Sequence, residues 1–594
     1  MGEHSLEHSL MRGTSERRGS TVSPWFAISA VLALLVTACQ PAAYAPVSGP
    51  QGGDAGSASP PRTLVLTDRQ EPANLHGKIA GSGSQGFGKE LFNADLAHYD
   101  ATGTPQPYLA EKLPELHTPS WQVFPDGRME TIYALRPKLT WHDGRPLTAD
   151  DFVFALRVYS NPQLSVFSSD PQKLVEEILA PDASTLVIRW RSLYPEAGEL
   201  TASSLDVLPR HILEQPYLAV EQDQANRDLF LNHPFWTSDY VGAGPYRLAR
   251  WARGIELEGV AFAGHALGRP KIDRIILRVI VDENTVLANV LSGDVQYATT
   301  LRFEDAQVLK RDWVPAGKGA IGYTPALFYH QVQFRPEFQK TPALLDLRVR
   351  QALVHAMDKM AIVDNLYAGD TTSADTFLNR QDRGYAEVDR AITKYPYDLR
   401  RAEQLLNEVG LAKDREGYFV NAAGTRLAPD YQVLQSAAYE RTGQAITDIW
   451  SRAGIDVQYS VLPNSLVRDN EVRQSFPGIA TPGISSSNPL LFLKNLSSSA
   501  IGTPANRWSG NNRGGWSNAE FDRLNQTFNA TIERSERERI VADAMKLASV
   551  EVPAMPVFYD FYVRPVVASQ LRGPSMSMSS LGTLFWNVYE WELR

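Results

Sequence analysis

The sequence contains very little cysteine. Cys39 is the only cysteine among the 594 residues, so the chain cannot form an intramolecular disulfide, and its folded part has no thiolate nucleophile. Beyond the N-terminal region, the sequence has no apolar run long enough to span a membrane. This argues against a membrane anchor in that part of the chain. No basic patch with interleaved aromatic residues occurs, and the formal net charge is −9. Nucleic acid is therefore not an expected partner.

Several hydrolase motifs are absent as well. The sequence has no G-x-S-x-G, S-x-x-K or H-E-x-x-H pattern, and its histidines show no metal-ligand spacing. We therefore expect no catalytic residues, no metal site and no cofactor. A hydrolase that uses paired carboxylates stays open as an alternative, because Asp and Glu are plentiful.

What is present is a long chain of ordinary composition, with 43% hydrophobic and 21% charged residues. One hydrophobic core rarely grows beyond about 250–300 residues. We therefore predict at least two lobes.

The N-terminal region has the order of charge and hydrophobicity that is typical of a secretory signal. Three arginines within residues 12–18 precede an apolar segment at residues 25–36, which is too short for an ordinary membrane span. The sequence Val-Thr-Ala-Cys at 36–39 follows and resembles a bacterial lipobox. This resemblance implies cleavage after Ala38 and lipidation of Cys39. The alternative is an ordinary signal followed by a free or buried cysteine.

We therefore assign residues 1–38 to a lipoprotein signal peptide. Residues 39–61 are mostly Gln, Pro, Ala, Gly and Ser and predict a flexible tether. Translation could begin at Met1 or at Met11, because the EHSL repeat at 3–10 precedes a more usual signal that starts at Met11.

The rest of the chain mixes strand and helix patterns in irregular order. Strands are predicted at 63–67, 174–178, 186–190 and 272–281, with a hairpin at 121–136 around Asp126-Gly127. Helices are predicted after a capping box that begins at Thr148, at 399–410, and twice within 345–369, with caps at Asp346 and Asp358. This mixture indicates an α/β protein with more than one sheet.

Six segments, taken in order, resemble the bacterial extracellular solute-binding proteins of family 5, which are the peptide, oligopeptide and nickel receptors of ABC importers. The segments are 141–151 (WHDGRPLTADD), 242–251 (GAGPYRLARW), 284–295 (NTVLANVLSGDV), 349–362 (VRQALVHAMDKMAI), 397–410 (YDLRRAEQLLNEVG) and 553–559 (PAMPVFY). We interpret each segment as structural. His142-Asp143-Gly144 is expected to be a tight turn, and Arg350 is expected to pair with Asp346 one helical turn earlier.

The resemblance implies a large, two-lobed periplasmic-binding-protein-like α/β fold of the cluster C type, with a hinge between the lobes. Lobe I would comprise residues 62–320, lobe II residues 321–559, and residues 560–594 would return to lobe I.

The resemblance also implies the function of an extracytoplasmic substrate-binding lipoprotein, periplasmic or at the cell surface and anchored to the membrane by lipid. It would act as a monomer, capture a peptide-like or other small solute, and deliver it to an ABC permease with separate ATPase subunits. A ligand-sensing receptor without transport would bind in the same way, and a secreted lipoprotein hydrolase is the other alternative.

The expected ligand contacts in lobe II depart from the family's pattern. Peptide-binding members place an aspartate against the ligand's α-ammonium shortly before a P…F-L stretch, but residues 474–493 of this chain contain no acid. We therefore expect a ligand other than a free-N-terminal peptide bound in the usual way, unless the register is shifted or another acid substitutes. The candidate contacts are Ser485, Ser486, Asn488, Trp508 and Trp516. The alternatives are a solvent loop for 485–488 and core packing for the tryptophans.

The segment GSGSQGFGKE at 81–90 has the outline of a phosphate-binding loop. Glu90 stands where such a loop needs Ser or Thr, and residues 71–80 are not the buried apolar strand that should precede it. We interpret the glycines as a loop at the rim of the ligand cleft, with Ser84 (or Ser82) as a candidate ligand contact.

Overall fold

The computed structural model describes residues 60–76, 87–167, 171–201, 204–322, 326–482, 489–560 and 565–594. Pro60–Arg594 forms one compact unit. Cys39, the signal peptide and nearly all of the tether lie outside the described residues. Among the helices that are described, none combines the length and apolar character needed to cross a bilayer.

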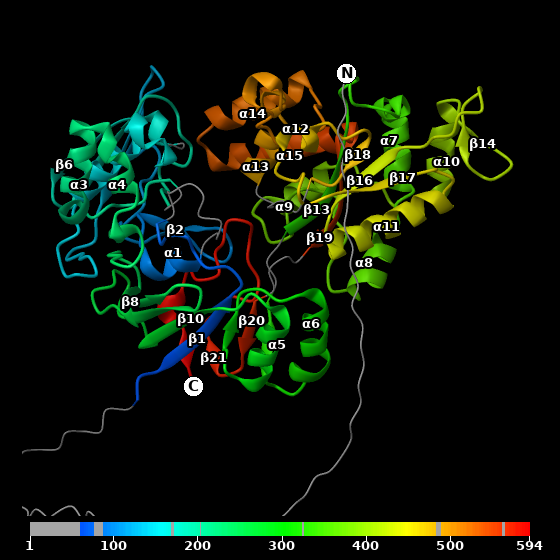
Figure 1. Cartoon of the computed structure of the whole chain (residues 1–594). Helices are drawn as coiled ribbons and strands as arrows, with labels where there is room; N and C mark the ends of the chain where they lie inside the picture. The colour runs from blue at the N-terminus through cyan, green and yellow to red at the C-terminus, as the bar shows by residue number, and fades with distance from the viewer. Residues whose placement is uncertain are drawn as a thin grey trace, which may run out of the picture. The chain divides into compact units, whose positions relative to one another are not determined.

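The largest sheet has seven strands, and it joins the beginning and the end of the described chain (Figure 1). Across the sheet these are β12 (Gly319–Ile321), β20 (Val566–Ala568), β11 (Tyr297–Ala298), β1 (Thr63–Asp68), β10 (Arg274–Val279), β9 (Glu256–Ala261) and β8 (Tyr246–Ala252). β1 pairs in parallel with β10 and β11, while β20 runs antiparallel to β11 and β12. Leu64 and Leu66 of β1 are fully buried, as expected for a strand at the centre of a sheet.

A four-stranded antiparallel sheet lies in the segment between β1 and β8. Its strands, in spatial order, are β4 (Trp121–Val123), β5 (Met129–Ala134), β7 (Thr185–Trp190) and β6 (Val175–Asp182). Helices α2 (Ala149–Tyr159) and α3 (Arg210–Gln222) contribute to the same hydrophobic core as this sheet and the seven-stranded one.

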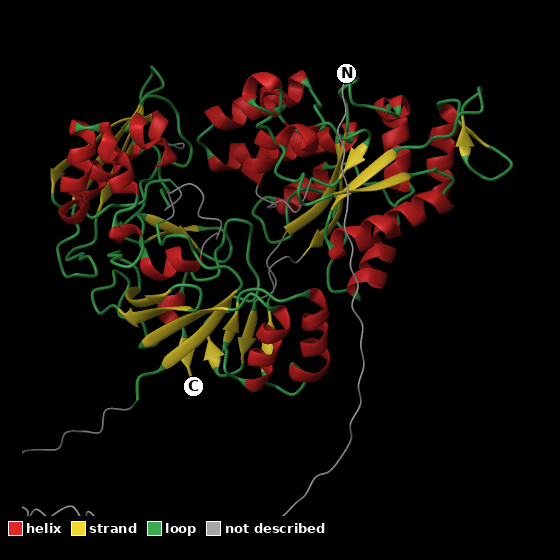
Figure 2. Cartoon of the chain, in the orientation of Figure 1, coloured by secondary structure: helices red, strands yellow, loops and turns green. Residues whose placement is uncertain are grey.

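The second large sheet is formed by strands between residues 326 and 560 and is separate from the seven-stranded sheet (Figure 2). Its strands, in spatial order, are β17 (Gln458–Leu462), β16 (Asp430–Leu434), β18 (Ile479–Ala480), β13 (Ala326–Val332) and β19 (Ala554–Asp560). β16 pairs in parallel with both β17 and β18, and β13 is antiparallel to β18 and β19. Its separate core also contains residues of α7 (Leu347–His355), α8 (Lys359–Tyr367), α10 (Leu399–Glu408) and α11 (Ala437–Arg452).

A third cluster of buried side chains is mainly helical. It contains residues of α9 (Tyr385–Ala391), α13 (Pro489–Leu496), α14 (Ala519–Ala530) and α15 (Arg534–Glu551). α15 leads directly into β19, so this helical cluster is tied to the edge of the five-stranded sheet.

The helix starts predicted from local chemistry are confirmed. The carboxylates of Asp346 and Asp358 cap α7 and α8 by accepting hydrogen bonds from Arg348 N and Ala361 N, both at 2.9 Å. Thr148 and Asp151 form the expected capping box at the start of α2. Each cap satisfies backbone N–H groups that the first turn of a helix leaves unpaired.

The predicted Asp346–Arg350 pair is wrong. Asp346 pairs instead with Arg348, at 2.7 Å. The guanidinium of Arg350 is buried and donates to the backbone carbonyls of Leu344, Leu345 and Glu551 at 2.8–3.1 Å. Arg350 therefore links the start of α7 to the end of α15.

His142 joins two of the segments that carried the family resemblance. Gly144 has φ +84°, and the Asp143 carboxylate accepts from Arg145 N at 3.0 Å, so the predicted turn is confirmed. The His142 ring then accepts from Gly242 N at 3.1 Å and lies 3.0 Å from Gly244 O. Both ring nitrogens of His142 are thus engaged with backbone groups, which gives this residue a structural role.

Candidate functional site

The carboxyl ends of three strands meet at one edge of the five-stranded sheet. β16 ends at Leu434 and β17 at Leu462, side by side in register, and β18 ends at Ala480. In open α/β sheets, ligands commonly bind outside such carboxyl ends. Polar groups at this edge are therefore candidates for holding a solute.

Two arginines converge at this edge. Arg473 lies in α12 (Asn470–Gln474), and Arg513 lies in the loop before α14. Both guanidinium groups donate to the same acceptor, the carbonyl oxygen of Pro482, at 2.9 Å from Arg473 and 2.5 Å from Arg513. Together they line a small hollow of about 10 Å³, whose other lining residues include Gln331, Gln432 and Thr481.

No Asp or Glu among the described residues neutralises these two positive charges. Neither Arg473 nor Arg513 forms an ion pair with a described Asp or Glu, and Nε of Arg473 is buried without a hydrogen-bond partner. Burial, followed by repulsion from Arg473, lowers the pKa of Arg513 to about 10, and burial also lowers the pKa of Arg473. Two such cations in one half-buried place are costly unless an anion joins them.

The side chain of Gln331, in β13, holds the backbone around Arg513 by hydrogen bonds. Gln331 Oε1 accepts from Arg513 N at 3.1 Å and from Gly514 N at 3.3 Å, while its Nε2 donates to Asn511 O at 3.1 Å. The side chain of Gln331 is buried. The position of Arg513 therefore follows from the strand, because the amide fixes three backbone groups of the loop.

Arg335 fixes the other side of the same loop. Its guanidinium donates to Gly502 O at 3.1 Å, to Arg513 O at 2.7 Å and to Gln474 O. Trp508 lies against it, with the Arg335 Cζ atom 5.7 Å from the centre of the indole ring. Trp508 thus packs against Arg335, the residue that holds the loop in place. Its contact with a ligand stays a prediction.

The remaining predicted ligand contacts have different positions. Trp516 is buried in the third core cluster, where its ring meets Phe521 edge-on at a centroid distance of 5.1 Å. Its ligand role also stays a prediction. Ser84, Ser485, Ser486 and Asn488 lie outside the described residues.

Sequence reasoning missed both Arg473 and Arg513 as candidate ligand contacts. One signal was present. The stretch from residue 474 to 493 lacks any acid, yet an arginine directly precedes it. The meeting of Arg473 with Arg513 needs the sheet and the loop together, which no local pattern reports.

A larger cavity, of about 140 Å³, lies beside the third cluster of buried side chains. It is lined by Tyr99 and by residues of α9, α14 and α15. Its charges are paired: Arg534 with Glu199 and Arg537 with Glu196, each at 2.6 Å. Burial raises the pKa of Glu199. Its polar groups are consequently engaged with one another, and its wall is otherwise apolar.

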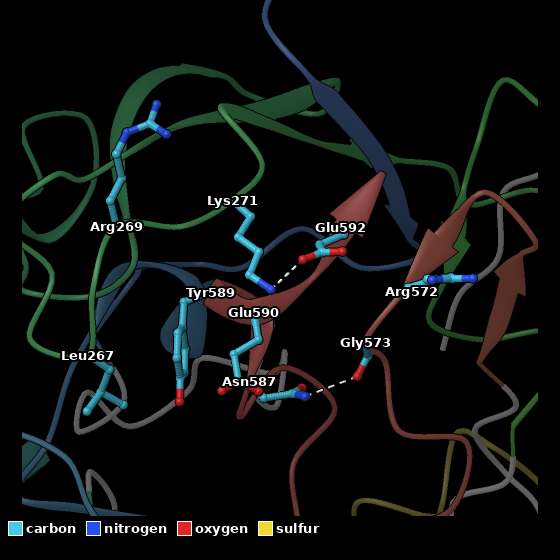
Figure 3. A pocket seen from close by; sticks show the side chains of 9 residues that line it. All are labelled: Leu267, Arg269, Lys271, Arg572, Gly573, Asn587, Tyr589, Glu590 and Glu592. Carbon is cyan, nitrogen blue, oxygen red and sulfur yellow. Dashed lines mark hydrogen bonds and ion pairs between the residues drawn. The ribbon is translucent and has the colours of Figure 1, made fainter. Parts of the chain in front are cut away.

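A third pocket lies on the face formed by β21 (Leu571–Arg572), β22 (Glu592–Leu593) and the chain before β10 (Figure 3). The ammonium of Lys271 points to the carboxylate of Glu592, and Asn587 Nδ2 donates to Gly573 O at 3.0 Å (Figure 3). Arg269 pairs with Asp273 at 2.7 Å. The lysine and Arg269 are thus neutralised by neighbouring acids. Nowhere in the described residues do three or more His, Cys, Asp or Glu side chains form a group that could hold a metal ion.

Comparison with known proteins identifies the family. The sequence profile "Bacterial extracellular solute-binding proteins, family 5 Middle" matches residues 104–503. A putative ABC transporter peptide-binding protein of Brucella ovis is 28% identical over 294 residues, which is 50% of this chain and 51% of that protein. The chain thus matches about half the length of the Brucella relatives. The dipeptide-binding protein of Escherichia coli is 23% identical over 526 residues, covering 85% of this chain and 90% of that protein.

Solved structures show the same fold. The oligopeptide-binding protein of Thermus thermophilus, complexed with a pentapeptide, is 24% identical with a TM-score of 0.65, covering 89% of this chain and 96% of that one. A periplasmic oligopeptide-binding protein of Thermotoga maritima is 18% identical with a TM-score of 0.71, covering 90% and 99%. This chain therefore belongs to the bacterial extracellular solute-binding proteins of family 5 and has their two-lobed α/β fold.

Proposed function

We propose that this protein is the extracytoplasmic solute receptor of an ABC importer and that it binds a peptide-like or other small solute without converting it. The observation that carries the proposal is the match of the family profile over residues 104–503. Relatives named as peptide-binding and dipeptide-binding proteins support a solute of this size and kind. Ligand contacts on both lobes would favour a closed form that a permease recognises.

The proposed lobes are 62–320 with 560–594, and 321–559. Sheet membership supports this division, because β20 belongs to the sheet of β1 while β13 and β19 belong to the other large sheet. The chain would then cross between lobes twice, near residues 321 and 560, and these crossings would form the hinge.

We also propose that Cys39 is lipidated and anchors the protein outside the cytoplasm. The support is the sequence Val-Thr-Ala-Cys directly after the apolar segment. Mass spectrometry of the N-terminal peptide should find a diacylglyceryl cysteine at position 39. Cys39→Ser should abolish this modification and release the protein from the membrane fraction, and membrane retention of Cys39→Ser contradicts the assignment.

The function is tested by identifying what the purified protein carries. The full chain, produced in a bacterial host, is denatured, and the released small molecules are identified by mass spectrometry and offered again to refolded protein. We expect a defined solute that rebinds and is recovered chemically unchanged. Recovery of a cleaved or otherwise converted solute would show an enzyme instead.

A further inference from the structure

We infer that Arg473 and Arg513 form an anion-binding subsite, so that the part of the ligand held by the edge of the five-stranded sheet carries a carboxylate or a similar oxyanion. This inference rests on the proposed function and specifies the chemical class of its solute. The hollow beside the two guanidinium groups has a volume of about 10 Å³, near the size of one water molecule. It therefore receives the end of a ligand and not a whole solute.

Hydrogen-bond geometry supports an oxyanion. A guanidinium offers five N–H donors in a planar fork. Within the described residues the side chains of Arg473 and Arg513 each make one hydrogen bond, and both bonds go to Pro482 O. Most of their donors are thus available, and the buried Nε of Arg473 has no partner. A carboxylate accepts from two such forks at once.

Electrostatics point the same way. Two cations that repel each other inside a half-buried site gain most from an anion placed between them. The described carboxylates nearest to Arg473 in sequence, Asp469 and Glu471, are exposed, and Asp469 is used to cap α12; Glu520, the nearest to Arg513, is exposed and pairs with Arg523. Residues 474–493 supply no acid. The charge at this edge is therefore opposite to that required for binding a ligand ammonium.

The arginines are not needed to hold the loop together. Arg513 is connected to the scaffold through its own backbone N and O, which bond to Gln331 and Arg335. Pro482 O is the only described acceptor of either side chain. A glutamine at position 473 or 513 still carries an N–H donor for that carbonyl. Both substitutions should consequently leave the protein folded.

The first experiment measures thermal unfolding of the full chain with acetate and with acetamide, its neutral isostere, at constant ionic strength. Acetate should raise the Tm of the wild type, and acetamide should not. Arg473→Gln and Arg513→Gln should remove the acetate effect while their Tm without acetate is unchanged or higher, because an unpaired buried cation has been removed. Matched controls are Arg468→Gln and Arg507→Gln, which change exposed arginines near the same elements.

The second experiment offers a tryptic digest of casein, untreated or with its carboxyl groups converted to methyl esters. The wild type should retain untreated peptides about tenfold better than esterified ones, a difference of about 1.4 kcal/mol, and the two glutamine variants should lose the preference. An acetate effect without retention of any peptide contradicts a peptide-like solute but supports the anion subsite. Equal retention of both digests, or neither an acetate effect nor a carboxyl preference, overturns the subsite.

Discussion

Arg335 shows how one side chain can organise a binding loop. Its guanidinium joins the carbonyls of Gln474, Gly502 and Arg513, which belong to three separate segments. Its Nε also donates to Gln333 Oε1 at 3.2 Å, and Phe338 packs against its face with 4.7 Å between Cζ and the ring centre. Burial lowers the pKa of this arginine, yet the pKa of a guanidinium starts so high that the group stays charged. The loop that carries Arg513 is thus fixed by a neighbouring strand end.

Replacing Arg335 with alanine should destabilise the protein by about 3 kcal/mol, because buried carbonyl oxygens lose charged hydrogen bonds. Arg335→Lys should recover only part of the loss, since one ammonium cannot match the planar fork. Denaturant unfolding monitored by tryptophan fluorescence measures both changes. Arg507→Ala, an exposed change in the same loop, should stay within about 0.5 kcal/mol of the wild type. A similarly small effect at Arg335 would show that the loop is held by other contacts.

In helix α10 (Leu399–Glu408), the start, the buried face and the end each have a separate physical cause. Asp398 accepts from Arg400 N and Arg401 N at 3.0 Å and begins the helix. Leu405 and Leu406 face the core of the five-stranded sheet, and Gly410 stops the helix with φ +80°. The helix is therefore amphipathic, with its apolar face packed against the core of the five-stranded sheet.

Asp398→Ala should lower the free energy of unfolding by about 1 kcal/mol, since two backbone N–H groups lose their acceptor. Asp398→Ser should retain most of the stability, because its hydroxyl can cap as well. The midpoint of urea unfolding distinguishes the two variants. Equal losses for Ala and Ser would mean that the carboxylate acts by charge and not by capping.

Across the whole molecule, buried or half-buried neutral histidines connect stability to pH. Burial lowers the pKa of His98, His142 and His265 from 6.5 to about 4, and that of His330 to about 3. When the chain unfolds, each imidazole regains its ordinary pKa and takes up a proton below pH 6.5. The unfolded state then binds more protons than the folded state, so the histidines lower stability as the pH falls from 6.5 towards 4. Asp68 and Asp151, whose pKa values are raised by burial, act in the opposite direction.

The histidine contribution can be isolated with His265→Gln. His265 lies 2.8 Å from Tyr108 Oη and 2.8 Å from Gly268 O, and an amide can serve both partners. Between pH 6.5 and 4 the variant should lose less stability than the wild type, by up to about 3 kcal/mol. Free energies of unfolding at several pH values measure the difference. Parallel pH profiles for the two proteins would show that this histidine is protonated equally in both states.

The sequence alone was enough to recognise the family, the helix caps at Asp346 and Asp358, and the turn at Gly144, because a cap or a turn depends on chemistry within a few neighbouring residues. The same local reasoning paired Arg350 with Asp346, and the pairing was wrong because a buried helix end, Glu551 O, competes for the guanidinium. The convergence of Arg473 and Arg513 on the carbonyl oxygen of Pro482, just after the end of β18, is visible only in the tertiary structure. Their meeting depends on strand order, on Gln331 and on Arg335, which are distant in sequence. Contacts of that kind depend on which strands and loops become neighbours in the folded sheet, and no local sequence pattern encodes them.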